Sequence, residues 1–322
     1  MSSVSVIICT YNRAQSLQET LASLAVQQHV SRTLELVVVD NNSTDQTLEV
    51  VRSFRKSSPL PLHYVREPRQ GIAFARNCGI QSAVGEYLLF TDDDVVAQPT
   101  WVEAMAQCLD QTQADVVGGK IQPLWRTPRP AWLVDELLGP VIHLDWGSAR
   151  MRITDAQRHF LTANMGLRRE SIKRYGAFQT SLGRRGDRWV GGEDAELCQR
   201  WARRGASLVY EPHAVVSHKI EADRVAPTFF RRWFQEIGYT QAHQLPWKWH
   251  HRVSILPAWR WLECLRTWID YQQARRGADE AIALKAECWW LLQRSFAVER
   301  WDHWTQRWVG ERAMNPCHFT RA

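Results

Sequence analysis

The chain has 322 residues, 45% of them hydrophobic and 23% charged, a balance that is typical of a globular protein with a full core and excludes a disordered chain. A net charge of +6 suits a phosphate-bearing substrate or an anionic membrane surface, but is too small to indicate nucleic-acid binding. Seven widely spaced cysteines without a CxxC pair indicate reduced thiols and argue against a cysteine zinc site. The sequence has no secretory signal pattern and no run of 18 apolar residues, so we expect a cytoplasmic protein without a spanning helix.

Apolar runs and amphipathic stretches alternate over residues 1–120. The strand-length runs are VSVIIC (4–9), LELVVV (34–39), LHYVR (62–66), EYLLF (86–90) and ADVVGGKI (114–121). Between them, residues 15–28, 43–54 and 71–83 have helical patterns. Apolar strands separated by helices predict an α/β fold with a mostly parallel sheet that is covered on both faces.

Polar residues collect where three of these strands end, as TYNR (10–13), DNNSTD (40–45) and TDDD (91–94). Each cluster alone is also typical of a turn or a helix cap. Ligands of parallel sheets bind beyond the carboxyl ends of the strands, so three such clusters together predict a site there.

Residues 121–190 are irregular, with four prolines among aromatic residues, and we interpret them as connecting loops and a wall that faces an acceptor. Residues 160–176 predict a strand followed by a helix. A Gly-rich loop then leads into an amphipathic helix over residues 189–205, and residues 206–212 predict a closing strand.

The acidic triplet Asp92, Asp93 and Asp94 is the most informative short stretch. In an extended segment Asp92 and Asp94 point the same way, so they can bind one divalent cation such as Mg²⁺ or Mn²⁺. Asp93 would then be free to bind a sugar or ribose hydroxyl. A capped turn remains the alternative.

Glu193 and Asp194 follow two glycines at the start of a predicted helix. Helix N-termini favour negative charge, which alone would explain the pair. A carboxylate there, beside Trp189 in a wall that closes over a substrate, could also act as a general base. Of His213 and His218 at the last strand, either could be a hydrogen-bonded structural residue, and one could complete a metal site.

Taken in order, the motifs VSVIICTYNR, VVVDNNSTD, GIAFARNCGI, FTDDD, TANMGLRR and GGEDAELCQRWARRGA resemble the family-2 glycosyltransferases with the GT-A fold. The resemblance covers residues 4 to about 220. It implies a nucleotide-sugar donor, most commonly UDP-linked in this family, a divalent metal, Mn²⁺ or Mg²⁺, and inversion at the anomeric carbon.

The resemblance also implies roles for individual residues. The nucleotide would be bound by Thr10, Tyr11, Asn12, Arg13, Asp40, Asn42, Arg76, Asp92 and Asp93. The metal ligands would be Asp92, Asp94 and His218. Asp194 would be the catalytic base, and the donor sugar or acceptor would contact Asn164, Met165, Trp189 and Glu193.

The sequence differs from the processive members of this family, which synthesise long polymers. Processive members carry spanning helices and a QxxRW motif, whereas FFRRW (229–233) has Phe229 where glutamine would stand. We therefore expect transfer of one or a few sugars to a glycan or lipid-linked acceptor. The alternatives are an inactive nucleotide-sugar or glycan-binding protein, and a nucleotidyltransferase, which normally has a glycine-rich phosphate loop that CTYNRAQS lacks.

Residues 221–322 form a second, helical region after the catalytic region 1–220. It holds 11 of the 17 tryptophans. One predicted apolar face contains Trp261, Leu265, Trp268 and Ile269, and another contains Ile282, Trp289, Trp290, Phe296 and Trp301. These faces could pack on the catalytic sheet, rest on the inner face of the cell membrane, or form a homodimer interface.

Overall fold

The structure is a computed structural model that describes residues 2–28, 32–155, 158–184, 191–244 and 258–314. Contacts within the chain define two compact units. The first comprises Met1–Pro128 and Val141–Ala222, and the second comprises Arg129–Pro140 and Asp223–Ala322. The segment 129–140 groups with the C-terminal helices.

The first unit alternates strands and helices as the sequence pattern predicts. Its strands are β1 (Val4–Thr10), β2 (Leu34–Asp40), β3 (Leu62–Arg66), β4 (Tyr87–Asp92), β5 (Val95–Ala97), β6 (Val116–Trp125), β7 (Met151–Arg152), β8 (Met165–Arg168) and β9 (Leu208–Ile220). Its helices are α1 (Ala14–Ala25), α2 (Thr47–Ser57), α3 (Ile72–Ser82), α4 (Trp101–Thr112), α5 (Arg169–Tyr175) and α6 (Glu193–Arg203). The sequence analysis missed α4 and the short strands β5 and β7.

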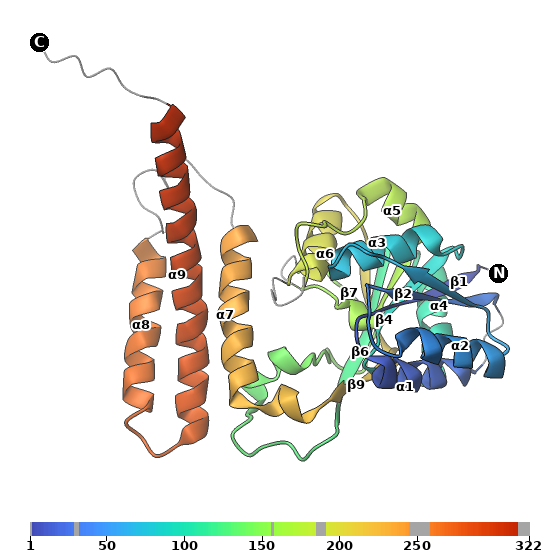
Figure 1. Cartoon of the computed structure of the whole chain (residues 1–322), viewed down its shortest axis with the longest axis horizontal. Coiled ribbons are helices and arrows are strands. Elements are labelled where there is room, and N and C mark those ends of the chain that lie inside the picture. The colour runs from blue at the N-terminus through green and yellow to red at the C-terminus, as the bar shows by residue number, and fades with distance from the viewer. Residues whose placement is uncertain (1, 29–31, 156–157, 185–190, 245–257, 315–322) are drawn as a thin grey trace, which may run out of the picture. The chain divides into compact units, whose positions relative to one another are not determined.

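One mixed sheet forms the centre of this unit, in the order β3-β2-β1-β4-β8-β6-β9-β5, with β7 paired to β9. The pairs among β1, β2, β3 and β4 are parallel, as is β6 with β9, while β8 runs antiparallel to both of its neighbours. Helices α1 and α2 lie on one side of the sheet and α3, α5 and α6 on the other (Figure 1). Every residue of β1 and β2 is buried, which explains why these strands are continuous apolar runs.

Strand register brings the polar strand ends together. Cys9 of β1 lies opposite Asp92 of β4, and Thr10 lies opposite Asp40 of β2. Because these strands are parallel, their carboxyl ends share one edge of the sheet. The residues that follow them therefore meet at that edge.

The second unit contains α7 (Pro227–Gln244), α8 (Ala258–Ala274) and α9 (Glu280–Met314). The segment 129–140 contacts these helices: the ring centroids of Trp132 and Phe230 lie 5.1 Å apart, and Lys285 forms an ion pair with Glu136 at 2.9 Å. No helix of the described residues is both long enough and apolar enough to cross a membrane.

The two predicted apolar faces of this unit differ in the structure. The face on α8 is exposed along its length. The predicted face on α9 is not uniform, because Phe296 is buried whereas Ile282 and Trp301 are exposed.

Candidate active site

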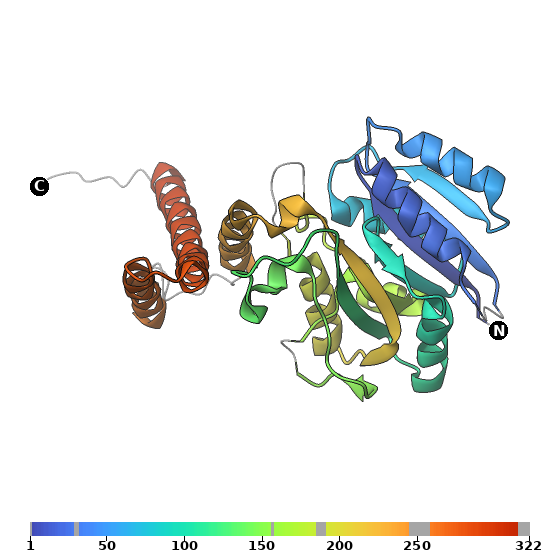
Figure 2. The same ribbon diagram turned by 90° about the horizontal axis from the view of Figure 1, so that it is seen from below.

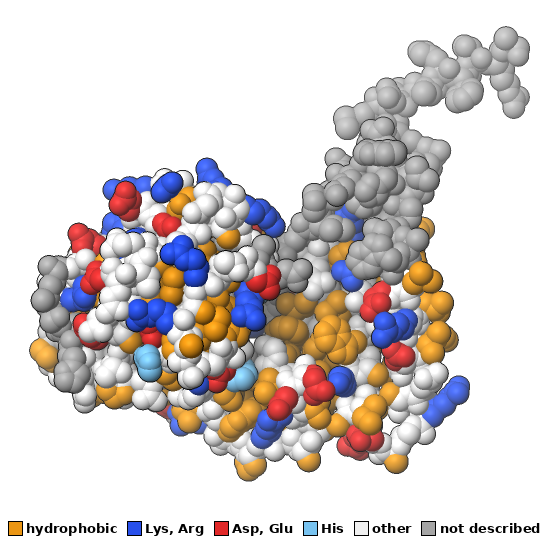
Figure 3. Space-filling model, turned by 180° about the vertical axis from the view of Figure 1, so that it is seen from behind, with side chains coloured by type: hydrophobic (Ala, Val, Ile, Leu, Met, Phe, Trp, Pro, Cys, Tyr) orange, Lys and Arg blue, Asp and Glu red, His pale blue; other side chains and the backbone are white. Residues whose placement is uncertain are grey.

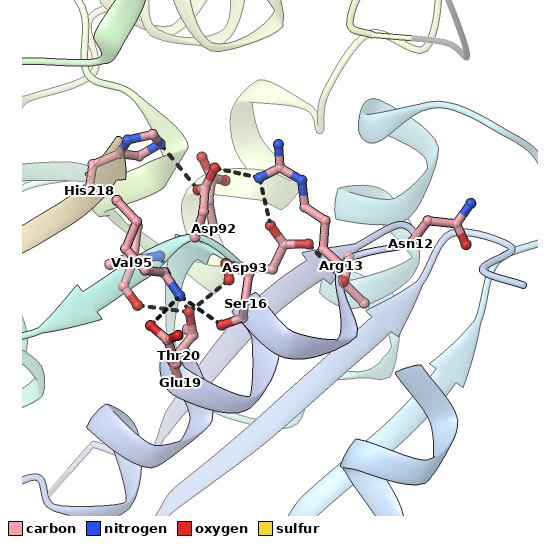
Figure 4. A network of polar contacts seen from close by, with 12 residues as sticks. Asn12, Arg13, Ser16, Glu19, Thr20, Asp92, Asp93, Val95 and His218 are labelled. Atoms are coloured by element: carbon pink, nitrogen blue, oxygen red, sulfur yellow. Dashed lines mark hydrogen bonds and ion pairs between the residues drawn. The ribbon is translucent and has the colours of Figure 1, made fainter. Parts of the chain in front are cut away.

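The acidic triplet lies at a turn between two strands. β4 ends at Asp92, residues 93–94 form the turn, and β5 begins at Val95. The hydroxyl oxygen of Thr20, on α1, lies 2.8 Å from the carbonyl oxygen of Asp93 and 2.7 Å from that of Val95, so the turn is anchored to α1 (Figure 4). The sequence analysis treated the triplet as extended, and that part of the prediction is wrong. The turn nevertheless gives the two carboxylates different partners: Asp93 contacts Thr10, and Asp94 contacts His218.

Asp93 points toward the end of β1. Thr10 Oγ1 donates a hydrogen bond to Asp93 Oδ2 at 2.7 Å. Arg13 Nη1 lies 2.5 Å from Asp94 Oδ2 and 3.4 Å from Asp93 Oδ1. Burial raises the pKa of Asp93 to about 7, with Arg13 opposing the rise and the charge of Asp94 adding to it. One guanidinium group thus offsets part of the negative charge of the turn.

His218 reaches the acidic turn because of the pairing between β5 and β9. In this antiparallel pair Val95 lies opposite His218, and the backbone N–H of Lys219 donates to the carbonyl oxygen of Asp94 at 2.8 Å. Nε2 of the fully buried His218 lies 3.1 Å from Asp94 Oδ1. One donor atom each from Asp92, Asp94 and His218 lies within 4.8 Å of the other two.

These three side chains fit a divalent cation. Carboxylate oxygens suit both Mg²⁺ and Mn²⁺, and an imidazole nitrogen suits Mn²⁺ and related transition metals. Within the described ranges, neither ring nitrogen of the buried His218 has a hydrogen-bond partner, and a buried polar atom without a partner is costly. Within the same ranges, no other group of three potential ligands gathers as closely.

We expect His218→Ala to weaken Mn²⁺ binding by at least about tenfold, because it removes one of three converging donors. Isothermal titration of the full chain with MnCl₂ measures this. His213→Ala is the matched control, since His213 lies on the same strand but is exposed. Equal Mn²⁺ affinity in the two variants would exclude His218 as a ligand.

The residues after β1 and β2 form one hydrogen-bonded loop pair. The Asn12 side-chain oxygen accepts from the backbone N–H of Thr44 at 2.7 Å, and the backbone N–H of Asn12 donates to Ser43 Oγ at 2.9 Å. The backbone N–H of Ser43 in turn donates to Asp40 Oδ1 at 2.7 Å. The two loops with predicted nucleotide-binding residues are therefore held against each other.

Two residues of β3 complete this part of the site. Tyr64 donates its hydroxyl proton to Asp40 Oδ2 at 2.6 Å, and Arg66 Nη2 donates to the Asn42 side-chain oxygen at 2.7 Å. Burial, and then the hydrogen bond to Asp40, raises the pKa of Tyr64 to about 12. Tyr11 lies in the loop after β1 and is 44% exposed. The sequence analysis missed Tyr64 and Arg66, although their alternate spacing at the end of a predicted strand was an available signal.

Arg76 of α3 connects the acidic turn to the start of α6. Its Nη1 lies 2.5 Å from Glu193 Oε1 and 3.0 Å from Asp194 Oδ1, and its Nη2 lies 3.8 Å from Asp92 Oδ1. Burial by itself would lower the pKa of Arg76, but the carboxylates, Asp194 first, raise it above its ordinary value. Burial, with the charge of Asp194, raises the pKa of Glu193. One buried guanidinium therefore contacts three of the predicted site carboxylates.

Thr162 holds the carboxylate of Asp194 from the other side. Its backbone N–H donates to Oδ2 at 3.1 Å, and its hydroxyl oxygen lies 3.2 Å from both carboxylate oxygens. Arg76 and Thr162 thus fix the orientation of Asp194. The sequence analysis missed Thr162, and a backbone donor leaves no signal in a sequence.

The remaining residues that the resemblance places at the sugar or acceptor are Asn164, Met165 and Trp189. The buried Asn164 amide forms hydrogen bonds within the protein. Its nitrogen donates to the carbonyl oxygens of Lys120 and Ala214, both at 2.8 Å, and its oxygen accepts from Trp101 Nε1 at 2.7 Å. Met165 is fully buried in β8. Trp189 lies outside the described residues. A role of these side chains toward a sugar stays a prediction.

Comparison with known proteins identifies the class. The model of the family described as "Glycosyl transferase family 2" matches residues 5–176. A glucosyl-dolichyl phosphate glucuronosyltransferase of Haloferax volcanii is 29% identical over 67% of this chain and 69% of its own length. The succinoglycan biosynthesis protein ExoM of Rhizobium meliloti is 27% identical over 78% of this chain and 77% of its own length.

Solved structures agree in fold. The mannosyltransferase PcManGT of Pyrobaculum calidifontis, solved with GDP-Man and Mn²⁺, covers 94% of this chain and 88% of its own with a TM-score of 0.61 and 22% identity. Residues 1–349 of TarS from S. aureus give a TM-score of 0.52. The protein is a glycosyltransferase with the GT-A fold. The chain belongs to glycosyl transferase family 2, as the motifs predicted.

Proposed function

We propose that the protein transfers a sugar from a nucleoside-diphosphate sugar to a hydroxyl of a glycan or lipid-linked acceptor, with inversion and with Mn²⁺ or Mg²⁺. The observation that carries the proposal is the buried Arg76, whose guanidinium contacts Asp92 at 3.8 Å and Asp194 at 3.0 Å. The candidate metal ligand and the candidate base thus lie within reach of one side chain.

Asp194 is the proposed base. Its carboxylate accepts the proton of the acceptor hydroxyl as that oxygen attacks the anomeric carbon. Arg76 and Thr162 fix its orientation before the acceptor arrives. One carboxylate suffices, because a nucleoside diphosphate is a good leaving group and needs no strong acid, unlike the leaving group of a glycoside hydrolase. Attack opposite to the leaving group inverts the anomeric centre.

The donor's nucleotide would bind at the paired loops after β1 and β2, where Asp40 would contact the base and Asn42 would be a second polar position in the same loop. Asp93 would accept a hydrogen bond from a ribose or sugar hydroxyl. Asp92, Asp94 and His218 would hold the divalent ion, which supplies positive charge to stabilise the departing diphosphate. Arg13 places a further positive charge beside the same turn.

Relatives support the acceptor class. The Haloferax relative is named for transfer to a glucosyl-dolichyl phosphate, which is a lipid-linked acceptor, and the Rhizobium relative is named for succinoglycan biosynthesis. A UDP-linked donor is the first candidate, and GDP- and dTDP-linked sugars belong in the same screen.

The test is a turnover assay with radiolabelled UDP-, GDP- and dTDP-sugars in the presence of Mn²⁺. Donors are first chosen by thermal shift, since a matched donor raises the melting temperature by binding the folded state. We expect release of the nucleoside diphosphate, label in the acceptor, and loss of both with EDTA. Release of pyrophosphate would indicate nucleotidyl transfer, and donor binding without turnover would indicate a binding protein.

A further inference from the structure

Helix α8 packs on α9 through polar and aromatic side chains. Arg260 Nη1 donates to the Gln293 side-chain oxygen at 2.8 Å, and its guanidinium lies 4.3 Å from the ring centroid of Phe296. Tyr271 stacks on Trp290 with ring centroids 5.3 Å apart and an interplanar angle of 11°. Among the described helices of this unit, α9 lies between α7 and α8 and packs against one side of α8 (Figure 1, Figure 2).

The opposite side of α8 is apolar and exposed. The exposed fractions are 45% for Trp261, 67% for Leu262, 54% for Leu265, 44% for Trp268 and 40% for Ile269. The spacing i, i+1, i+4, i+7 and i+8 places these side chains on one side of the helix. Hydrophobic side chains accordingly reach the surface of the C-terminal helices (Figure 3).

This arrangement is the reverse of an ordinary surface helix. Such a helix buries its apolar side and exposes its polar side. Here Arg260 and Tyr271 face the neighbouring helix, while two tryptophans and three aliphatic residues face outward. A continuous apolar surface of this kind marks a site of protein or membrane interaction.

The net charge of the C-terminal region indicates what kind of surface the apolar face of α8 can bind. Residues 223–322 carry 15 Lys and Arg against 10 Asp and Glu, whereas residues 1–222 carry 25 against 24, so nearly all the net positive charge belongs to the C-terminal region. Arg275 and Arg276, just after the end of α8, are exposed, and Arg266 of α8 is 74% exposed and pairs with Asp270 at 3.9 Å. Basic residues attract anionic headgroups, and tryptophan prefers the membrane interface.

A second copy of the chain fits this face less well. In a two-fold dimer the same patch meets itself. The region that carries this patch has 15 Lys and Arg against 10 Asp and Glu, so two self-paired copies would bring like net charges together, and like charges across an interface are unfavourable.

We propose that the outward face of α8 docks the protein on an anionic membrane surface, with Trp261, Leu265 and Trp268 inserted at the boundary between headgroups and acyl chains. Such a helix lies in the plane of the interface and does not span the bilayer. Docking of this kind would place the enzyme at the surface that holds lipid-linked acceptors. The proposal does not depend on turnover, so it is tested separately from the proposed function.

The experiment is sedimentation of the full chain with vesicles of phosphatidylglycerol and phosphatidylcholine. We expect binding that falls in 0.5 M NaCl, because salt screens the arginines, and that is much weaker with phosphatidylcholine alone. Leu265→Glu should weaken binding more than about tenfold, since it removes apolar area from the face and adds a negative charge. Val84→Glu is the matched control, because Val84 is 75% exposed in the first unit.

Three outcomes would overturn the proposal. The first is equal vesicle binding by Leu265→Glu and Val84→Glu, and the second is no binding by the unmodified chain. The third is a stable dimer in analytical ultracentrifugation that Leu265→Glu dissociates. Thermal melting of both variants checks that each is folded.

Discussion

Asp194→Asn is expected to lower kcat by about a hundredfold or more, because general-base catalysis typically contributes a factor of 10²–10⁴. The KM for the donor and the affinity for Mn²⁺ should change little, since Asp194 is not among the three proposed metal ligands. Steady-state kinetics and Mn²⁺ titration measure these quantities.

The structure also sets the controls for this variant. Arg76 and the backbone N–H of Thr162 donate to different oxygens of Asp194, so an asparagine NH₂ group must face one of these donors. Thermal denaturation therefore accompanies the kinetics. Glu196→Gln, on the same helix but paired with Arg200 at 2.6 Å, is the matched control and should keep kcat. Wild-type kcat in Asp194→Asn, with loss in Glu193→Gln, would move the base to Glu193.

Arg76→Met is expected to lower the free energy of unfolding by about 3–5 kcal/mol, because removing one partner of a buried ion pair leaves uncompensated buried charge. Arg76 is the buried cation between Asp92, Glu193 and Asp194, and methionine preserves much of its volume. Urea denaturation followed by circular dichroism measures the loss.

Arg158→Met is the control for this change. Arg158 pairs with Asp155 at 3.9 Å, and 47% and 57% of the two side chains are exposed, so this ion pair is screened by water. The unfolding free energy of Arg158→Met should stay close to that of the unmodified protein. Similar losses in the two variants would show that Arg76 is no more important to stability than a surface arginine.

The central sheet was predictable because its strands are buried on both faces. β1 and β2 are continuous apolar runs, and a run of that length bounded by polar residues has few other interpretations. The antiparallel strand β5 was not predictable, since its three residues are too short for any periodic pattern.

The part of the candidate site that lies at the ends of strands was predictable from the sequence. The resemblance implied that Asp92, Asp94 and His218 lie together, and the structure brings one donor atom of each within 4.8 Å of the others. The bridge from Arg76 to Glu193 joins residues 117 positions apart, and the Thr162 contact uses a backbone donor. Neither leaves a periodic signal in a single sequence.

The pairing of β5 with β9 has a consequence for how the site is assembled. His218 faces the acidic turn only while Val95 lies opposite it, and successive side chains of a strand point to opposite faces. A slip of one residue along this edge would move the acidic turn relative to His218, because the orientation of His218 itself is also held by the pairing of β9 with β6, where Pro123 lies opposite it. The alignment of a three-residue edge strand, and not the acidic triplet alone, therefore decides whether nitrogen and oxygen donors meet.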